Sequence, residues 1–323
     1  MTEPISRRIF LAGAVGVGMV SACGDDDGVQ GGDDPATTTR PPPSTSTTTT
    51  PTPEATAAPV EPVELPGPVF ALGVASGDAQ PDRVMLWTRL VVDPLVAGGA
   101  MGDDDLVVAW DVARDDDFTD LVGSGTALAE ARFGHAVHVD ADGLSPGEDY
   151  RYRFRIGDQT SPTGRTRTVP AGAVDRFSFV LATCQDLQFG EYAAWRDVAT
   201  TADLDAVVFT GDYIYELPAF DVSPGGDGQR VWASPPPIDL DGFRLRYGQV
   251  KADASLQAAH AALPWFVIWD DHEITDNYWS GGPGQFDAAG GDFAARRAAA
   301  YQAWWEHQPV RLDPPVDGVL PIH

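Results

Sequence analysis

Cysteine and positive charge are both scarce in this sequence. Its 323 residues include two cysteines, and 21 lysines and arginines stand against 48 aspartates and glutamates, a formal net charge of -27. Such a negative charge argues against nucleic acid or an anionic surface as a partner. If Cys23 is lipidated, Cys184 has no partner for an internal disulfide. Cys184 is then a buried hydrophobe, a nucleophile or a metal ligand.

The N-terminal segment has no hydrophobic run long enough to span a bilayer. Arg7 and Arg8 precede an apolar stretch at residues 9–20, and small residues follow it up to Cys23. This is typical of a signal peptide, and twin arginines indicate the twin-arginine (Tat) route. Residues 20–23 resemble a bacterial lipobox. We expect residues 1–22 to be the signal peptide and Cys23 to be lipidated, whereas a buried N-terminal helix is the alternative.

Residues 23–66 contain almost no large apolar side chains and are rich in threonine, proline and aspartate. Such a segment cannot offset its ordering entropy by burial, so it is predicted to be a disordered tether. We therefore expect an exported bacterial protein, at the cell surface or outside the cell, that meets the Tat translocase during export. Its only membrane contact would be the lipid at Cys23.

Residues 67–170 predict a β-sandwich. Short segments rich in β-branched and aromatic residues are separated by Gly, Asp and Pro turns. At residues 149–156, aromatic and arginine side chains alternate with the period of a half-buried strand. The preceding GLSPGEDY is similar to the tyrosine corner of fibronectin-III-type sandwiches. His135 and His138 have no acidic cluster of ligand spacing around them, and we interpret them as surface or packing residues.

The pattern changes to α/β after residue 170. Apolar runs within residues 176–184, 204–212 and 264–270 predict strands buried on both faces of a sheet, with helical segments between and after them. The last predicted helix is capped by Asp292 and stopped by Pro309. Residues 171–323 therefore predict an α/β domain.

Each of the three predicted buried strands ends in groups that can bind a metal. Cys184 follows the first, Asp212 and then Tyr215 follow the second, and Asp270, Asp271 and His272 follow the third. The carboxyl ends of strands form the ligand crevice of open α/β sheets, so these groups are expected to converge. Thiolate, phenolate and carboxylate together favour ferric iron over zinc or magnesium. Spare carboxylates favour a second, calcium-like site.

Several motifs resemble those of the PhoD-type alkaline phosphatases, namely FALGVASGDAQPDRVMLWTRL, GLSPGEDYRYRFR, ATCQ, FTGDYIYE and WDDHEITDN. The resemblance runs from about residue 70 to residue 323. It implies a sandwich followed by the N-terminal part of a four-layer α/β/β/α metallophosphoesterase domain. It also implies an exported phosphomonoesterase or phosphodiesterase that uses Fe3+ and Ca2+.

The resemblance also implies roles for single residues. Cys184, Asp212 and Tyr215 match the iron ligands. Asp271 stands where broader metallophosphoesterases have a metal-binding asparagine, and His272 stands at the phosphate-facing histidine. His272 would stabilise the transition state or protonate the leaving oxygen while metal-activated water attacks phosphorus. The neighbouring polar residues are interpreted as orienting or capping groups: Asp270, Glu273, Asp276 and Asn277.

The family's further Gly-Asp-x-His-type motif does not follow before the sequence ends at DGVLPIH. We therefore expect a C-terminally truncated, incomplete enzyme. Two alternatives stay open. One is a thiol hydrolase with Cys184 as nucleophile and His272 as base. The other is a non-catalytic calcium-binding surface protein. The substrate also stays open among phosphomonoesters, diesters, teichoic acid and phospholipid.

Overall fold

A computed structural model describes residues 55–221, 223, 229–284 and 290–321. The predicted signal peptide and most of the predicted tether, with Arg7, Arg8 and Cys23, lie outside the described residues, as does His323. In the ranges that are described, no helix has both the length and the apolar character needed to cross a bilayer.

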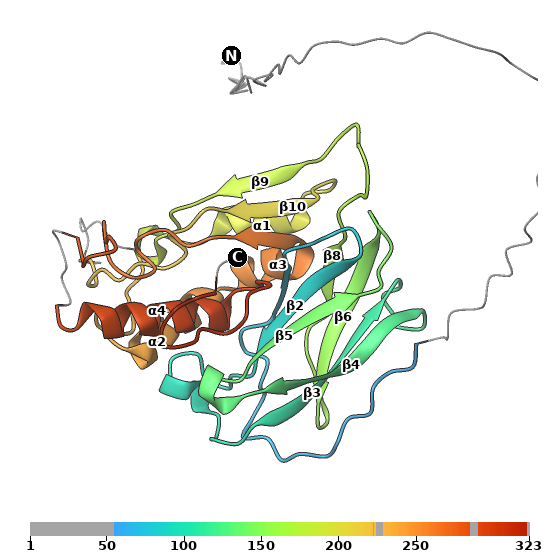
Figure 1. Cartoon of the computed structure of the whole chain (residues 1–323), viewed down its shortest axis with the longest axis horizontal. Coiled ribbons are helices and arrows are strands. Elements are labelled where there is room, and N and C mark those ends of the chain that lie inside the picture. The colour runs from blue at the N-terminus through green and yellow to red at the C-terminus, as the bar shows by residue number, and fades with distance from the viewer. Residues whose placement is uncertain (1–54, 222, 224–228, 285–289, 322–323) are drawn as a thin grey trace, which may run out of the picture. The chain divides into compact units, whose positions relative to one another are not determined.

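The strands of the described residues form two sheets (Figure 1). The six-stranded sheet has the order β5-β2-β1-β11-β10-β9 and consists of β1 (Val74–Gly77), β2 (Arg83–Arg89), β5 (Ala136–Asp142), β9 (Phe179–Ala182), β10 (Ala206–Phe209) and β11 (Pro264–Val267). The five-stranded sheet has the order β4-β3-β6-β7, with β8 also paired to β6, and consists of β3 (Leu106–Ala113), β4 (Leu121–Ala129), β6 (Asp149–Ile156), β7 (Gln159–Thr160) and β8 (Gly164–Arg167).

The predicted sandwich is present. Tyr150, Tyr152, Phe154 and Ile156 of β6 are buried, and they form one core with side chains of β1, β2 and β5. The tyrosine corner is also confirmed, because the Ser145 N–H donates to the Tyr150 hydroxyl at 2.8 Å. The fold class read from the sequence, a sandwich followed by an α/β region, is therefore correct.

One sheet runs through both parts of the chain. β1 pairs antiparallel with β2 and parallel with β11, with Ser76 opposite Pro264 and Gly77 opposite Trp265. Gly77 permits this close packing, since a Cβ there would lie 2.2 Å from the Pro309 carbonyl oxygen. The sequence pattern predicts a sandwich at residues 67–170 and an α/β domain at residues 171–323. In the structure both ranges belong to the same compact unit.

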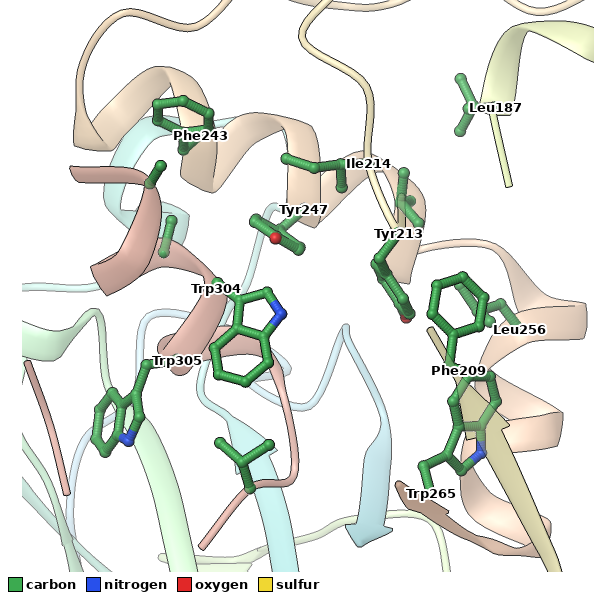
Figure 2. Close-up of a cluster of buried hydrophobic side chains, with 14 of the residues drawn as sticks. Leu187, Phe209, Tyr213, Ile214, Phe243, Tyr247, Leu256, Trp265, Trp304 and Trp305 are labelled. Atoms are coloured by element: carbon green, nitrogen blue, oxygen red, sulfur yellow. The ribbon is translucent and has the colours of Figure 1, made fainter. Parts of the chain in front are cut away.

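Four α-helices and three 3-10 helices accompany the sheets in the described residues. Asp292 caps the helix α4 (Phe293–His307) as predicted, because its carboxylate accepts hydrogen bonds from the Ala294 and Ala295 N–H groups. A core of aromatic side chains, including Tyr213, Tyr247, Trp265 and Trp304, fills the space between helices and sheet (Figure 2). The α-helices are α1 (Ala193–Thr200), α2 (Leu240–Lys251), α3 (Ala254–Ala262) and α4 (Phe293–His307), and the 3-10 helices are η1 (Ala97–Ala100), η2 (Ala131–Phe133) and η3 (Leu187–Phe189).

Two predictions need correction. β9 was expected to be buried on both faces, but it is the edge strand, and Phe179 and Leu181 are 51% and 66% exposed. Apolar residues occupy both of its faces, but only the face with Val180 and Ala182 packs against the core. Residues 55–66 were assigned to the disordered tether, yet they lie along the sandwich. Ser124 and Arg155 donate hydrogen bonds to the Thr56 and Ala58 carbonyls, which holds a segment poor in apolar side chains through its backbone.

The two histidines of the sandwich range are packing residues, as interpreted from the sequence. The His138 ring stacks on Trp305 with 4.2 Å between ring centres, and its Nε2 lies 2.9 Å from the Gln308 carbonyl. His135 Nε2 lies 3.0 Å from the Asp104 carbonyl. Neither ring points to a metal role.

Candidate metal centre

The loops after three neighbouring parallel strands meet at one edge of the six-stranded sheet. β9 pairs with β10 and β10 pairs with β11, so the segments that follow them lie side by side. Among the described residues, Asp212, Asp271 and His272 each offer a ligand atom within 4.8 Å of the others. The predicted convergence of these sequence-distant groups is therefore present.

Asp212 is at the centre of this cluster. It follows β10 with φ +57°, and its Oδ2 accepts hydrogen bonds from Cys184 Sγ at 3.2 Å and from the Tyr215 hydroxyl at 3.1 Å. Its Oδ1 is buried and has no hydrogen-bond partner in the described residues. Burial raises the pKa of this carboxyl group. A buried carboxylate oxygen without a partner is costly, and a bound cation would satisfy it.

Cys184 and Tyr215 bring softer donors to the same carboxylate. The Cys184 N–H donates to the Gly211 carbonyl at 3.1 Å, which ties the loop after β9 to the loop after β10. Burial and then the Asp212 charge raise the pKa of Tyr215 far above its ordinary value. The phenol therefore keeps its proton in the absence of a cation, so a strong Lewis acid is needed to make it a ligand.

The hydrogen-bond partners of the Cys184 thiol bear on the thiol-hydrolase alternative. In the described part of the chain these partners are the Thr183 hydroxyl, at 3.3 Å, and the Asp212 carboxylate. A nucleophilic thiol needs a base such as imidazole within reach. The nitrogens of His272 instead face Glu216 and Asp276. This geometry does not support a thiol–imidazole pair.

Asp271 and His272 lie in a turn after β11. Asp271 Oδ1 accepts the His272 N–H at 3.1 Å, and its Oδ2 accepts the Asn277 N–H at 2.5 Å. His272 Nδ1 lies 2.8 Å from Glu216 Oε2, and the ring centre lies 4.3 Å from that of Tyr215. Burial lowers the pKa of His272, but the hydrogen bond and charge of Glu216 outweigh it, and the pKa is raised to about 9.

Glu273 holds the loop after β10 and the turn after β11 together through hydrogen bonds to their backbone. This side chain is 1% exposed, and it accepts the Tyr213 N–H at 2.7 Å, the Asp270 N–H at 2.9 Å and the Asp212 N–H at 3.1 Å. Burial raises its pKa to about 7 despite these three donors. The geometry agrees with the interpretation of Glu273 as an orienting group.

Two residues of the site were not singled out from the sequence. Glu216 directly follows Tyr215, and its place in the motif FTGDYIYE is the sequence feature that could have identified it as a site residue. Arg246 of α2 donates to the Tyr215 carbonyl at 3.0 Å and lies 4.2 Å from the centre of the Trp232 ring. No sequence pattern pointed to Arg246, because α2 itself was not predicted.

Two family models match this chain. The model described as PhoD-like phosphatase covers residues 179–320, and the model of the PhoD-like phosphatase N-terminal domain covers residues 55–170. The chain belongs to the PhoD-like phosphatase family. This membership confirms the resemblance read from the sequence motifs, and it favours a metal-dependent site.

Two PhoD relatives show how far the similarity extends. Alkaline phosphatase D of Bacillus subtilis (strain 168) is 48% identical over 248 residues, which are 75% of this chain and 42% of that protein. A solved structure titled "Structure of PhoD" matches with a TM-score of 0.74 and 43% identity, over 80% of this chain and 50% of that one. The chain thus spans about half the length of these PhoD proteins or less. The roles of single site residues stay predictions.

Proposed function

We propose that this chain carries the metal centre of an exported phosphatase that hydrolyses phosphomonoesters, phosphodiesters or both. The observation that carries the proposal is the buried, unpartnered Oδ1 of Asp212 at the point where three strand ends meet. Membership of the PhoD-like family supports the same reaction class.

The donor set fits two kinds of cation. Cys184, Asp212 and Tyr215 offer thiolate, carboxylate and phenolate, which suit Fe3+. Asp271, together with Asp212, offers the oxygen ligands that Ca2+ prefers. Bound cations would neutralise the charge of the phosphate and activate water for attack on phosphorus.

His272 is the proton-carrying group of this proposal. Glu216 binds its Nδ1, so Nε2, which lies 3.8 Å from Asp276 Oδ1, is the nitrogen that would meet the phosphate. Without a bound cation, burial lowers the pKa of His272, but the hydrogen bond and charge of Glu216 raise it to about 9, which favours the protonated ring at neutral pH. An imidazolium can donate a hydrogen bond to a phosphate oxygen or a proton to the leaving oxygen.

The proposed location follows from the N-terminal sequence. Arg7 and Arg8, with the lipobox-like residues 20–23, favour Tat export and a lipid anchor at Cys23. Replacing both arginines by lysine should keep the protein inside the cell. Mass spectrometry of the mature N-terminus should find lipid on Cys23, and an unmodified cysteine in surface-bound protein would contradict the anchor.

The reaction is tested with the full chain after loading with Fe3+ and Ca2+. Phosphate release from p-nitrophenyl phosphate and hydrolysis of bis-p-nitrophenyl phosphate are measured for the wild type, His272→Ala and Cys184→Ala. Hydrolysis that stops with a chelator and falls in His272→Ala supports the proposal. Hydrolysis that persists with the chelator and disappears in Cys184→Ala would establish the thiol mechanism instead. Calcium binding without any hydrolysis is the result expected of an incomplete enzyme and of the non-catalytic surface protein alike, and iron binding through Cys184 then separates the two.

A further inference from the structure

A cavity of about 340 Å3 opens beside the metal centre. Cys184 and Asp186 line it on the side of the centre, and Tyr192 and Trp195 line it at the start of α1. Its volume lies at the lower end of the range for small-molecule sites. Because Cys184 also contacts Asp212, a molecule in the cavity lies next to the proposed phosphate position.

The cavity offers mainly apolar surface, much of it aromatic, and one buried acceptor, Asp186 Oδ2, which has no hydrogen-bond partner in the described residues. Gln185 engages the polar ends of both rings, since its carbonyl accepts the Tyr192 hydroxyl at 2.8 Å and its Oε1 accepts Trp195 Nε1–H at 2.8 Å. Trp195 also packs against Phe209 and Trp265. The rings are therefore fixed, and their apolar parts are left for an occupant.

Phe189 adds an exposed ring to this lining. It is 60% exposed, although the backbone around it is tightly held. The fully buried Gln188 accepts the Phe220 N–H at 2.6 Å and donates to the Pro218 carbonyl at 3.3 Å. Phe220 in turn places its ring centre 5.5 Å from that of Phe189. An exposed aromatic side chain on a fixed backbone is a preorganised contact for a ligand.

The charges around the cavity restrict what can enter. Asp186 and Glu191 are the charged residues that line it in the described part of the chain, and no lysine, arginine or histidine joins them there. Glu191 is exposed. Arg230 lies over the Tyr192 ring at 4.6 Å, but it is paired with Asp253 at 2.8 Å. A second phosphate or carboxylate in the cavity would meet the two lining carboxylates, so an anionic occupant is disfavoured.

We propose that this cavity binds the leaving group of the phosphoester and that this group is an uncharged aromatic alcohol. The inference rests on the proposed function, because it places the ester's phosphorus at the metal centre. It adds a specificity-determining residue, Phe189, which contacts the leaving group without taking part in the chemistry.

The test compares two phosphonates that differ in the predicted contact alone. Benzylphosphonate and methylphosphonate are titrated into the metal-loaded full chain by calorimetry. We expect benzylphosphonate to bind more tightly, and Phe189→Ala to weaken it about 2- to 10-fold, the range of an aromatic contact. Methylphosphonate affinity should not change. Phe179→Ala, which removes a ring that is 51% exposed and lies outside the cavity, is the matched control and should leave both affinities unchanged.

Several outcomes would overturn the inference. These are equal affinity for the two phosphonates, equal weakening of both by Phe189→Ala, absence of binding, or tighter binding of 2-aminoethylphosphonate than of benzylphosphonate. The last outcome would indicate a cationic leaving group. Hydrolysis is measured separately. If benzylphosphonate binding depends on Phe189 but no ester is hydrolysed, the proposed function is contradicted and the cavity assignment stands. If metal-dependent hydrolysis occurs but benzylphosphonate binding does not depend on Phe189, the proposed function stands and the cavity assignment is contradicted.

Discussion

Glu216 Oε2 lies 2.8 Å from His272 Nδ1, and this contact joins the loop after β10 to the turn after β11. Glu216 is 3% exposed, and its other oxygen accepts the Asp276 N–H at 2.6 Å. The carboxylate therefore fixes both the ring orientation and the nitrogen that faces the site. A buried acid that fixes a histidine in this way tunes its basicity as well.

Replacing Glu216 by glutamine should lower turnover by about 10- to 100-fold, the usual effect of losing such an orienting partner. The amide keeps the shape but removes the charge that favours protonated His272. Steady-state hydrolysis by the metal-loaded protein measures the effect. Glu148→Gln, a change at an exposed position of the sandwich, is the control. Equal turnover of Glu216→Gln and wild type would show that His272 needs no such partner.

Replacing Glu273 by glutamine should destabilise the fold by about 1–3 kcal/mol. Three backbone N–H groups donate to this carboxylate, and an amide would present an NH2 group to at least one of them. Urea unfolding at neutral pH measures the loss, again against Glu148→Gln. An unchanged midpoint would mean that the loops hold their positions without Glu273.

Tyr215 should give the iron-loaded protein a visible colour. A phenolate bound to Fe3+ produces a charge-transfer band, and Tyr215 keeps its proton until such a cation binds because burial and Asp212 raise its pKa. Tyr215→Phe should remove the band. If the band persists in Tyr215→Phe, the phenolate ligand is another residue. Tyr278→Phe, which alters a half-buried tyrosine beyond the site, is the control.

Acid should destabilise the protein through its buried histidines. His307 is fully buried, its Nε2 lies 2.6 Å from Arg89, and its Nδ1 lies 2.6 Å from the Ala303 carbonyl. Burial and then the Arg89 charge hold its pKa well below the ordinary value. The unfolded chain binds this proton near pH 6.5 and the folded chain does not, so stability is complete above pH 6.5 and falls as the pH drops below it.

The measurement is the unfolding free energy as a function of pH. Each such histidine contributes a slope of up to about 1.4 kcal/mol per pH unit. His260, also buried with its pKa lowered by burial, acts in the same direction. His307→Gln keeps an acceptor for Arg89 but cannot titrate, so its slope below pH 6.5 should be shallower. A slope equal to that of the wild type would exclude His307 as a source of acid sensitivity.

Local patterns predicted much of this fold. The alternation in β6, the cap at Asp292 and the polar groups after three apolar runs each follow from a few neighbouring residues, and each is present in the structure. Non-local features were missed. The pairing of β1 with β11 joins segments far apart in sequence, and the exposure of β9 depends on which strands lie beside it.

The site shows the same limit. Asp212 and His272 lie in the short segments that follow β10 and β11. Glu216 lies four residues beyond Asp212 in a chain with 48 acidic residues, and only its place in FTGDYIYE distinguishes it. The helix α2 was missed because it buries Arg246 and Lys251 along with Phe243 and Tyr247. Such a mixture of buried charges and aromatics obscures the apolar stripe by which a helix is predicted.

The central claim is that the strand ends around Asp212 hold a metal ion, and metal content tests it most directly. The wild type, Asp212→Asn and Asp142→Asn, an exposed control on β5, are loaded with Fe3+ and Ca2+, freed of loose ions by gel filtration and analysed by mass spectrometry of the elements. We expect the wild type and the control to retain metal. The metal content of Asp212→Asn should be lower by about 10-fold or more, because the substitution weakens metal binding. Equal metal content in all three proteins would contradict the claim.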